Sequence, residues 1–205
     1  MGRWRAIYDF WFGAPGSEDH GTVREFWFRG GPSVDLEIRE RFEDDYRRAA
    51  AGEYAAWRDG RESALALVVT LDQFPRNIYR GDARSFSADA EARAVARHIV
   101  AQPWHAQLLA VERVFAYLPF EHSEDLADQK RAVELFESIG PHPERENWID
   151  YAVRHMVIVE KFGRFPHRNE ILGRQGTPEE LEWLASNGER FGTDGKGKPE
   201  EKPAP

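Results

Sequence analysis

Residues 62–81, ESALALVVTLDQFPRNIYRG, decide the fold class of this chain. The first part, residues 62–74, is apolar on nearly every side of a helix, which predicts a buried central helix. Pro75 predicts the end of that helix, because proline disfavours helical geometry in the residue before it. Similar helical periods recur along the chain, and no long alternation of polar and apolar residues indicates a strand. The sequence therefore predicts an all-α protein.

Further helices are predicted at about residues 33–52, 87–100, 107–118, 123–140, 145–162 and 177–188. Ser123 is the predicted N-cap of one of them, since acidic residues follow it directly. Residues 177–180, TPEE, form the clearest start signal, a capping box with proline at the first helical position. The short connections predict antiparallel helical hairpins in a bundle or a short solenoid.

Length and composition indicate one domain followed by a tail. The chain has 205 residues with 41% hydrophobic residues, and no interior stretch resembles a linker. Residues 192–205 consist mainly of Gly, Lys, Glu and Pro, which predicts disorder. We therefore expect a single domain over residues 1–191 and a disordered tail over residues 192–205.

Several functional classes are excluded or disfavoured by composition. The net charge of −8 opposes non-specific binding to nucleic acid or to an anionic membrane. The absence of cysteine excludes disulfides, thiolate zinc sites and cysteine nucleophiles. No apolar run is long enough to cross a bilayer and no signal peptide is evident, so we expect a cytoplasmic protein. Since the sequence has no HExxH pair or other cofactor motif, we expect neither a metal nor a cofactor.

Asp72 is the first polar residue that calls for explanation. It falls on the same helical face as Leu65, Val68 and Val69. A buried carboxylate is costly unless it is paired and hydrogen-bonded. Asp72 therefore either fixes the turn through a structural ion pair or orients a ligand-binding arginine, such as Arg76.

Residues 118–128, LPFEHSEDLAD, form the densest acidic stretch. It contains Glu121, His122 and Asp125, and the predicted helix start at Ser123 places free backbone amides beside the first two. These acids are either solvated capping residues or partners of the basic stretch 162–174, FGRFPHRNEILGR. Charge-assisted contacts between carboxylate and guanidinium groups are strong and directional.

His155 lies in an apolar stripe with Trp148, Ala152, Val159 and Phe162. A core histidine that is hydrogen-bonded to a carbonyl or a carboxylate explains this position. A general base or a ligand contact also explains it, because imidazole titrates near neutral pH. The sequence leaves both alternatives open.

Four stretches make the chain resemble a bacterial family of unknown function, DUF924. They are residues 10–13, FWFG; 71–81, LDQFPRNIYRG; 118–129, LPFEHSEDLADQ; and 162–174, FGRFPHRNEILGR. The resemblance extends from about residue 8 to residue 191. It implies a tetratricopeptide-like helical fold, and it implies no established activity, cofactor or catalytic residue.

From these observations we expect a polar site that binds a small anionic molecule or a peptide carboxylate. The predicted ligand-binding residues are Asp72, Arg76, Asn77, Glu121, His122, Asp125, His155, Arg164, His167, Arg168 and Asn169. In an alternative hypothesis the same pocket is hydrolytic, with His155, His122 and Glu121 as the acid–base candidates. In a third, the polar residues form a closed structural network in a scaffold for protein contacts. The sequence carries no prediction of the oligomeric state.

Overall fold

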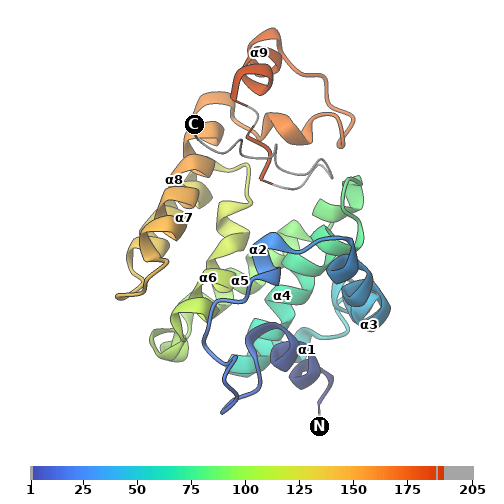
Figure 1. Ribbon diagram of the computed structural model, residues 1–205, viewed down its shortest axis with the longest axis vertical. Helices are drawn as coiled ribbons and strands as arrows, with labels where there is room; N and C mark the ends of the chain where they lie inside the picture. Colours follow the sequence, from blue (N-terminus) through green and yellow to red (C-terminus); the bar gives the residue numbers. More distant parts are fainter. Residues whose placement is uncertain (1, 188, 192–205) are drawn as a thin grey trace, which may run out of the picture.

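The computed structural model describes residues 2–187 and 189–191, and within them the fold is all-α with no strand, as predicted (Figure 1). The α-helices are α1 Arg3–Phe12, α2 Phe26–Arg29, α3 Pro32–Ala50, α4 Arg61–Ile78, α5 Asp89–Ala101, α6 Ala110–Glu121, α7 Leu126–Glu137, α8 Arg145–Phe162 and α9 Pro178–Asn187. Short 3-10 helices are η1 Ala55–Asp59, η2 Ala83–Phe86, η3 Pro103–Gln107 and η4 Pro166–Arg168. The tail 192–205, for which we predicted disorder, lies outside the described residues.

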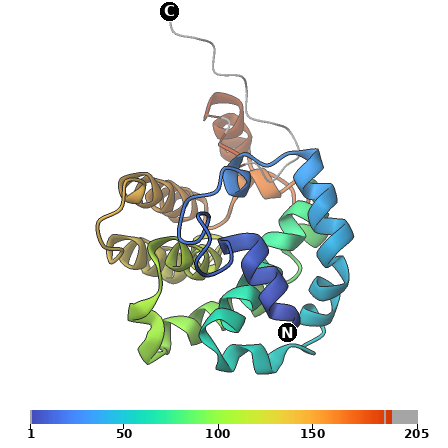
Figure 2. The same ribbon diagram turned by 60° about the horizontal axis from the view of Figure 1, so that its bottom comes forward.

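Helix α4 is the central helix that the sequence predicts. It packs against α1, α3, α5 and α6. Its residues are buried from Ser63 through Arg76, because apolar side chains surround the helix axis. The neighbours of α4 come from both sides of it in the chain, so it is the element around which the first half of the fold is packed. Figure 2 shows α1 in front of this bundle and α3 along its right edge.

The second half of the chain adds helices in succession. α6 packs against α7, and α7 packs against α8, so each new helix lies on the one before it. Figure 1 shows α7 and α8 side by side, with α9 above them. Helical hairpins are therefore present here, whereas the tetratricopeptide-like repeat stays a prediction.

The prediction that Pro75 ends the central helix was wrong. α4 continues to Ile78 and contains Pro75, and α6 likewise contains Pro119. Proline removes a single backbone bond near the end of each helix. In α4 the last turn is held by the buried Ile78 and by a bond from the Tyr79 amide to the Pro75 carbonyl at 2.9 Å. Packing thus outweighs the local preference.

The predicted N-cap at Ser123 was also wrong. α7 begins at Leu126, and the side chain of Asp125 caps it by accepting from the Ala127 amide at 2.8 Å. Ser123 is buried instead and donates to Asp128 at 2.9 Å. The acidic stretch therefore divides into a connection, residues 122–124, and a capping residue.

The capping box of α9 is confirmed. The Glu180 amide donates to the Thr177 hydroxyl at 3.2 Å, and the Thr177 amide donates to the Glu180 carboxylate at 2.7 Å. α9 packs near η4, and a small apolar cluster of Ile158, Val159 and Phe165 joins this part of the chain to α8. This docking places η4 against the bundle.

Among the described residues, no helix is both long enough and apolar enough to cross a membrane.

Candidate functional site

The polar residues of three distant stretches meet where the C-terminal ends of α4 and α6 approach α8 and η4. The connection after α8 makes this possible, because α8 ends at Gly163 in the left-handed conformation, with φ 68°. The chain then turns back, and η4 buries its two basic side chains. Of the predicted site residues, the structure brings together Asp72, Arg76, Glu121, His122, His155, His167 and Arg168.

Asp72, with 1% of its surface exposed, is the anionic centre of this cluster. His122 Nδ1 lies 2.8 Å from one carboxylate oxygen, and Gln73 donates to the other. Arg76 Nη1 is 3.5 Å from the carboxylate. Burial opposes ionisation, but the charge of Arg76 and the bonds from His122 and Gln73 outweigh it and lower the pKa of Asp72. Asp72 is therefore ionised, as a paired buried carboxylate should be.

The ionised Asp72 fixes the tautomer of His122. A carboxylate accepts hydrogen bonds only, so Nδ1 of His122 carries the proton and Nε2 keeps its lone pair. The side chain of His122 is 14% exposed. Burial and the charge of Arg76 lower the pKa of His122, which keeps the ring neutral. An aspartate thus orients a neutral imidazole.

Arg76 is neutralised by two carboxylates. Its Nη1 lies 2.8 Å from Asp89 Oδ1 and donates to the Asp72 carbonyl at 2.7 Å. Asp89, in the first turn of α5, was not among the predicted site residues. A first-turn acid is explained by the helix dipole alone, so its sequence position carries no sign of this second role.

Glu121 and His155 form a neutral pair beside Asp72. Glu121 Oε1 and His155 Nδ1 are 3.3 Å apart, and Nδ1 also lies 2.8 Å from the Tyr151 carbonyl. Burial and the charge of Asp72 raise the pKa of Glu121 to about 8. Burial lowers the pKa of His155 well below its usual value. Neither group is charged at neutral pH, which fits a low-dielectric site.

Arg168 is held by aromatic rings more than by carboxylates. Its guanidinium lies 4.7 Å from the centre of the Phe86 ring and 4.4 Å from that of Phe165. Nη1 donates to the His122 carbonyl at 3.0 Å, but the nearest Asp89 oxygen is 3.8 Å away. Burial lowers the pKa of Arg168 to about 10. This buried cation is thus oriented firmly and neutralised weakly.

His167 is 4% exposed, and neither of its ring nitrogens has a hydrogen-bond partner among the described residues. The same is true of Nε of Arg168. Burial, together with the charges of Arg168, Arg190 and Arg174, lowers the pKa of His167 to about 3. A closed network requires complete pairing, which this part of the cluster lacks.

Glu124 and Arg174 fasten η4 to the bundle. Arg174 donates both Nη groups to Glu124, at 2.6 and 2.9 Å. Glu124 also accepts from the Phe165 amide at 2.8 Å. Both residues belong to the two motifs noted in the sequence, although neither was a predicted ligand-binding residue. Their pairing confirms that the acidic and basic stretches meet.

Phe191, after α9, covers the cluster. Its ring stacks on His155, with centroids 3.6 Å apart and an angle of 20° between the ring planes. Phe165 and His167 flank it at 6.4 and 5.7 Å. Nothing in the sequence pattern distinguishes this phenylalanine from any other at the end of a helix.

The structure gives the remaining four predicted residues other contacts. Asn77 donates to the Gln73 carbonyl within α4, and Asp125 caps α7. Arg164 and Asn169 both bind Glu180 at the start of α9. The bonds to Glu180 connect the η4 region to α9, so Arg164 does not join the group formed by Glu121, His122 and His155.

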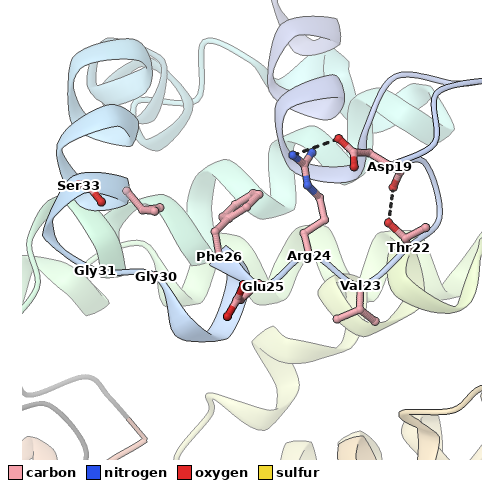
Figure 3. Close-up of a pocket in the computed structure, with 10 residues that line it drawn as sticks. Asp19, Thr22, Val23, Arg24, Glu25, Phe26, Gly30, Gly31 and Ser33 are labelled. Carbon is pink, nitrogen blue, oxygen red and sulfur yellow. Dashed lines mark hydrogen bonds and ion pairs between the residues drawn. The ribbon is translucent and has the colours of Figure 1, made fainter.

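Two solvent-accessible hollows lie elsewhere. The first, of about 530 Å³, is lined by part of the segment between Asp19 and Val34, where Arg24 turns toward Asp19 at 3.4 Å (Figure 3). The second, of about 500 Å³, lies around Gly140 and His142. Neither is lined by a predicted site residue. In the present conformation the polar cluster is packed beneath Phe191.

Within the described part of the chain, no three histidine or carboxylate side chains are grouped closely enough to hold a metal ion. The donor set of the cluster agrees with this, since Asp72 and Glu124 are already bonded to arginines or histidine.

Comparison with known proteins identifies relatives but no activity. No curated protein matches the chain. A solved structure of a protein of unknown function from Agrobacterium tumefaciens is 40% identical and superposes with a TM-score of 0.77. The similarity covers 88% of this chain and 96% of that one. The family described as "Bacterial protein of unknown function (DUF924)" matches residues 7–188, so this chain is a member of the DUF924 family.

Proposed function

We propose that the cluster binds a small anion, a phosphate or a carboxylate, through His167 and Arg168. The observation that carries the proposal is the set of buried donors in η4 that lack partners among the described residues. A buried polar group without a hydrogen bond is destabilising, and native proteins retain such groups mainly where they have a use. An anion is the partner that satisfies several of these donors at once.

The charge distribution supports an anion in preference to a neutral ligand. Asp89 lies 2.8 Å from Arg76 but 3.8 Å from Arg168, so the ion pair of Asp89 with Arg168 is the weaker of the two. Guanidinium groups bind carboxylates and phosphates in a planar, two-point geometry. The flanking rings of Phe86 and Phe165 fix the guanidinium before a ligand arrives, which reduces the entropy lost on binding.

The proposal is tested by the melting temperature in inorganic phosphate and in acetate, each against chloride at equal ionic strength. A ligand that binds only the folded state stabilises it in proportion to the logarithm of its concentration. We expect a stabilisation by at least one anion that Arg168→Met abolishes. The control Arg47→Met removes an arginine whose side chain is 65% exposed on α3 and should keep the effect. Equal response of wild type and Arg168→Met to both anions contradicts the proposal.

A second function, hydrolysis of an anionic ester at the same cluster, is favoured by one separate observation. Asp72 orients His122 so that Nε2 can take a proton from water. Glu121 has a pKa of about 8 and is therefore protonated at neutral pH. Together they supply a general base and a general acid at neutral pH. Hydrolysis of p-nitrophenyl phosphate and p-nitrophenyl acetate tests this. His122→Asn should abolish turnover while the anion-dependent stabilisation remains, and the absence of wild-type turnover rejects hydrolysis of these esters.

A further inference from the structure

The ring of Phe191 lies in a slot built from aromatic side chains. Its face stacks on His155 at an angle of 20°, while Phe165 and His167 meet it at 78° and 69°. Stacked and edge-to-face contacts are the two favourable arrangements of aromatic rings. A slot with His155 stacked below the ring and with Phe165 and His167 edge-to-face at its sides therefore accommodates a flat ring better than a branched aliphatic group.

The backbone that carries this ring is not in a relaxed conformation. Phe191 has φ 47°, in the left-handed region that residues other than glycine adopt infrequently. The segment is also tied down by an ion pair between Glu189 and Arg154, whose side chain is 38% exposed. Both residues of this ion pair are partly buried. Phe191 thus occupies the slot at the cost of backbone strain.

The slot adjoins the donors of the proposed anion site. His167, whose ring nitrogens lack partners among the described residues, is one of its walls. The other wall, Phe165, carries the guanidinium of Arg168 on its ring at 4.4 Å. A ring in the slot is therefore adjacent to His167, and the ring of Phe165 contacts both the slot and the guanidinium of Arg168.

We infer that the slot over His155 is a subsite for a planar ring, and that Phe191 occupies it in the absence of ligand. The ligand class is then an aromatic phosphate or carboxylate, with its ring on His155 and its anionic group at His167 and Arg168. The inference rests on the proposed anion-binding function. Binding of such a ligand displaces Phe191, whose ring covers the cluster in the present conformation.

The test compares anions that share a charged group and differ by a ring. Dissociation constants are measured by calorimetry for inorganic phosphate and phenyl phosphate, and for acetate and benzoate, with the full chain. The variants are Phe191→Ala, which empties the slot, and Phe191→Leu, which keeps an apolar side chain without a flat face. Phe28→Ala is the control, because Phe28 lies on α2 and is 56% exposed.

For at least one pair, Phe191→Ala should strengthen binding of the aromatic anion about tenfold and change binding of its ring-free partner less than about twofold. Phe191→Leu should give a smaller gain, and Phe28→Ala none. If phosphate or acetate binds but the ring brings no selective gain in Phe191→Ala, the slot is a structural contact. The ring subsite is then rejected, while the anion site stands. If none of the four anions binds to wild type or Phe191→Ala, both the ring subsite and the proposed anion-binding function are rejected.

Discussion

The two Phe-Pro motifs of this chain, residues 74–77 and residues 165–169, use similar residues to opposite effect. In the first, Pro75 lies inside α4 and Arg76 is neutralised by Asp72 and Asp89. In the second, Pro166 follows the end of α8, and Arg168 lies between two aromatic rings. In the first motif both Nη groups of Arg76 bond to Asp89, and Nε alone lacks a partner among the described residues. In the second, both ring nitrogens of His167 and the Nε of Arg168 lack one.

The difference shows that the role of the arginine depends on whether the motif lies inside the last turn of a helix or in the connection after it. Arg76 projects from a helix whose neighbour α5 begins with Asp89. Arg168 sits in a short 3-10 turn whose nearby carboxylate, Glu124, is already bonded to Arg174. The first arrangement stabilises the fold, and the second leaves donors for a ligand. Four predictions test this division.

The largest expected effect is on stability when the two arginines are replaced in turn. Arg76→Met leaves the buried Asp72 without its arginine and the partly buried Asp89 without its nearest cation, and should lower the free energy of unfolding by about 3–5 kcal/mol. Arg168→Met removes a weakly neutralised cation and should cost less than about 1.5 kcal/mol. Urea denaturation of both variants gives the comparison. Similar losses in the two variants contradict the division.

The second prediction concerns Glu121, which the ionised Asp72 keeps protonated. The pKa of Glu121 rises from 4.5 to about 8 on folding, so between these pH values only the unfolded chain releases the proton. Stability is therefore lost as the pH rises from 4.5 to 8. Glu121→Gln removes this loss, and relative to wild type it should gain on the order of 3 kcal/mol between pH 5 and pH 8. If the stability difference between Glu121→Gln and wild type does not change with pH, the pKa of Glu121 is not raised on folding and the prediction is contradicted.

The third prediction concerns His167 in the second motif and has the opposite sign. The pKa of His167 falls from 6.5 to about 3 on folding, so below pH 6.5 the unfolded chain takes up a proton that the folded chain refuses. Stability falls as the pH falls through this window. Relative to wild type, His167→Gln should gain about 2 kcal/mol between pH 7 and pH 5. Thermal or urea unfolding at both pH values measures it, and parallel curves for the two proteins contradict the buried neutral histidine.

The smallest expected effects come from the asparagines of the two motifs. Asn169→Ala removes a 3.2 Å bond to buried Glu180 and should cost about 1 kcal/mol, whereas Asn77→Ala removes a contact within α4 and should cost about 0.5 kcal/mol. Neither change should alter anion binding. Loss of anion-dependent stabilisation in Asn169→Ala restores the expectation that this residue orients the ligand.

The features that follow from local physics were predictable from the sequence. The helical period gave the buried central helix, and the Thr177–Glu180 capping box marked the start of α9. The charge pattern indicated that the acidic and basic stretches meet, and Glu124 and Arg174 pair as expected of such stretches. Seven of the eleven predicted site residues lie in one cluster.

The features that depend on tertiary packing were not predictable. Pro75 stays helical because Ile78 is buried against the bundle. Asp89 carries an ordinary helix-start signal, and its ion pair with Arg76 depends on how α5 crosses α4. The position of Phe191 over His155 depends on the path of the chain after α9. No local pattern encodes such long-range contacts.

The most direct test of the account is a titration of the histidine ring nitrogens by NMR with inorganic phosphate, and then with benzoate, against chloride at matched ionic strength. An anion at the second motif stabilises protonated His167, so its signals should shift and its pKa should rise from about 3. Signals of His98, which lies in α5 and whose Nε2 is 3.1 Å from the Arg58 carbonyl, should not shift. His167 signals that stay unchanged at high concentrations of both anions contradict the anion site.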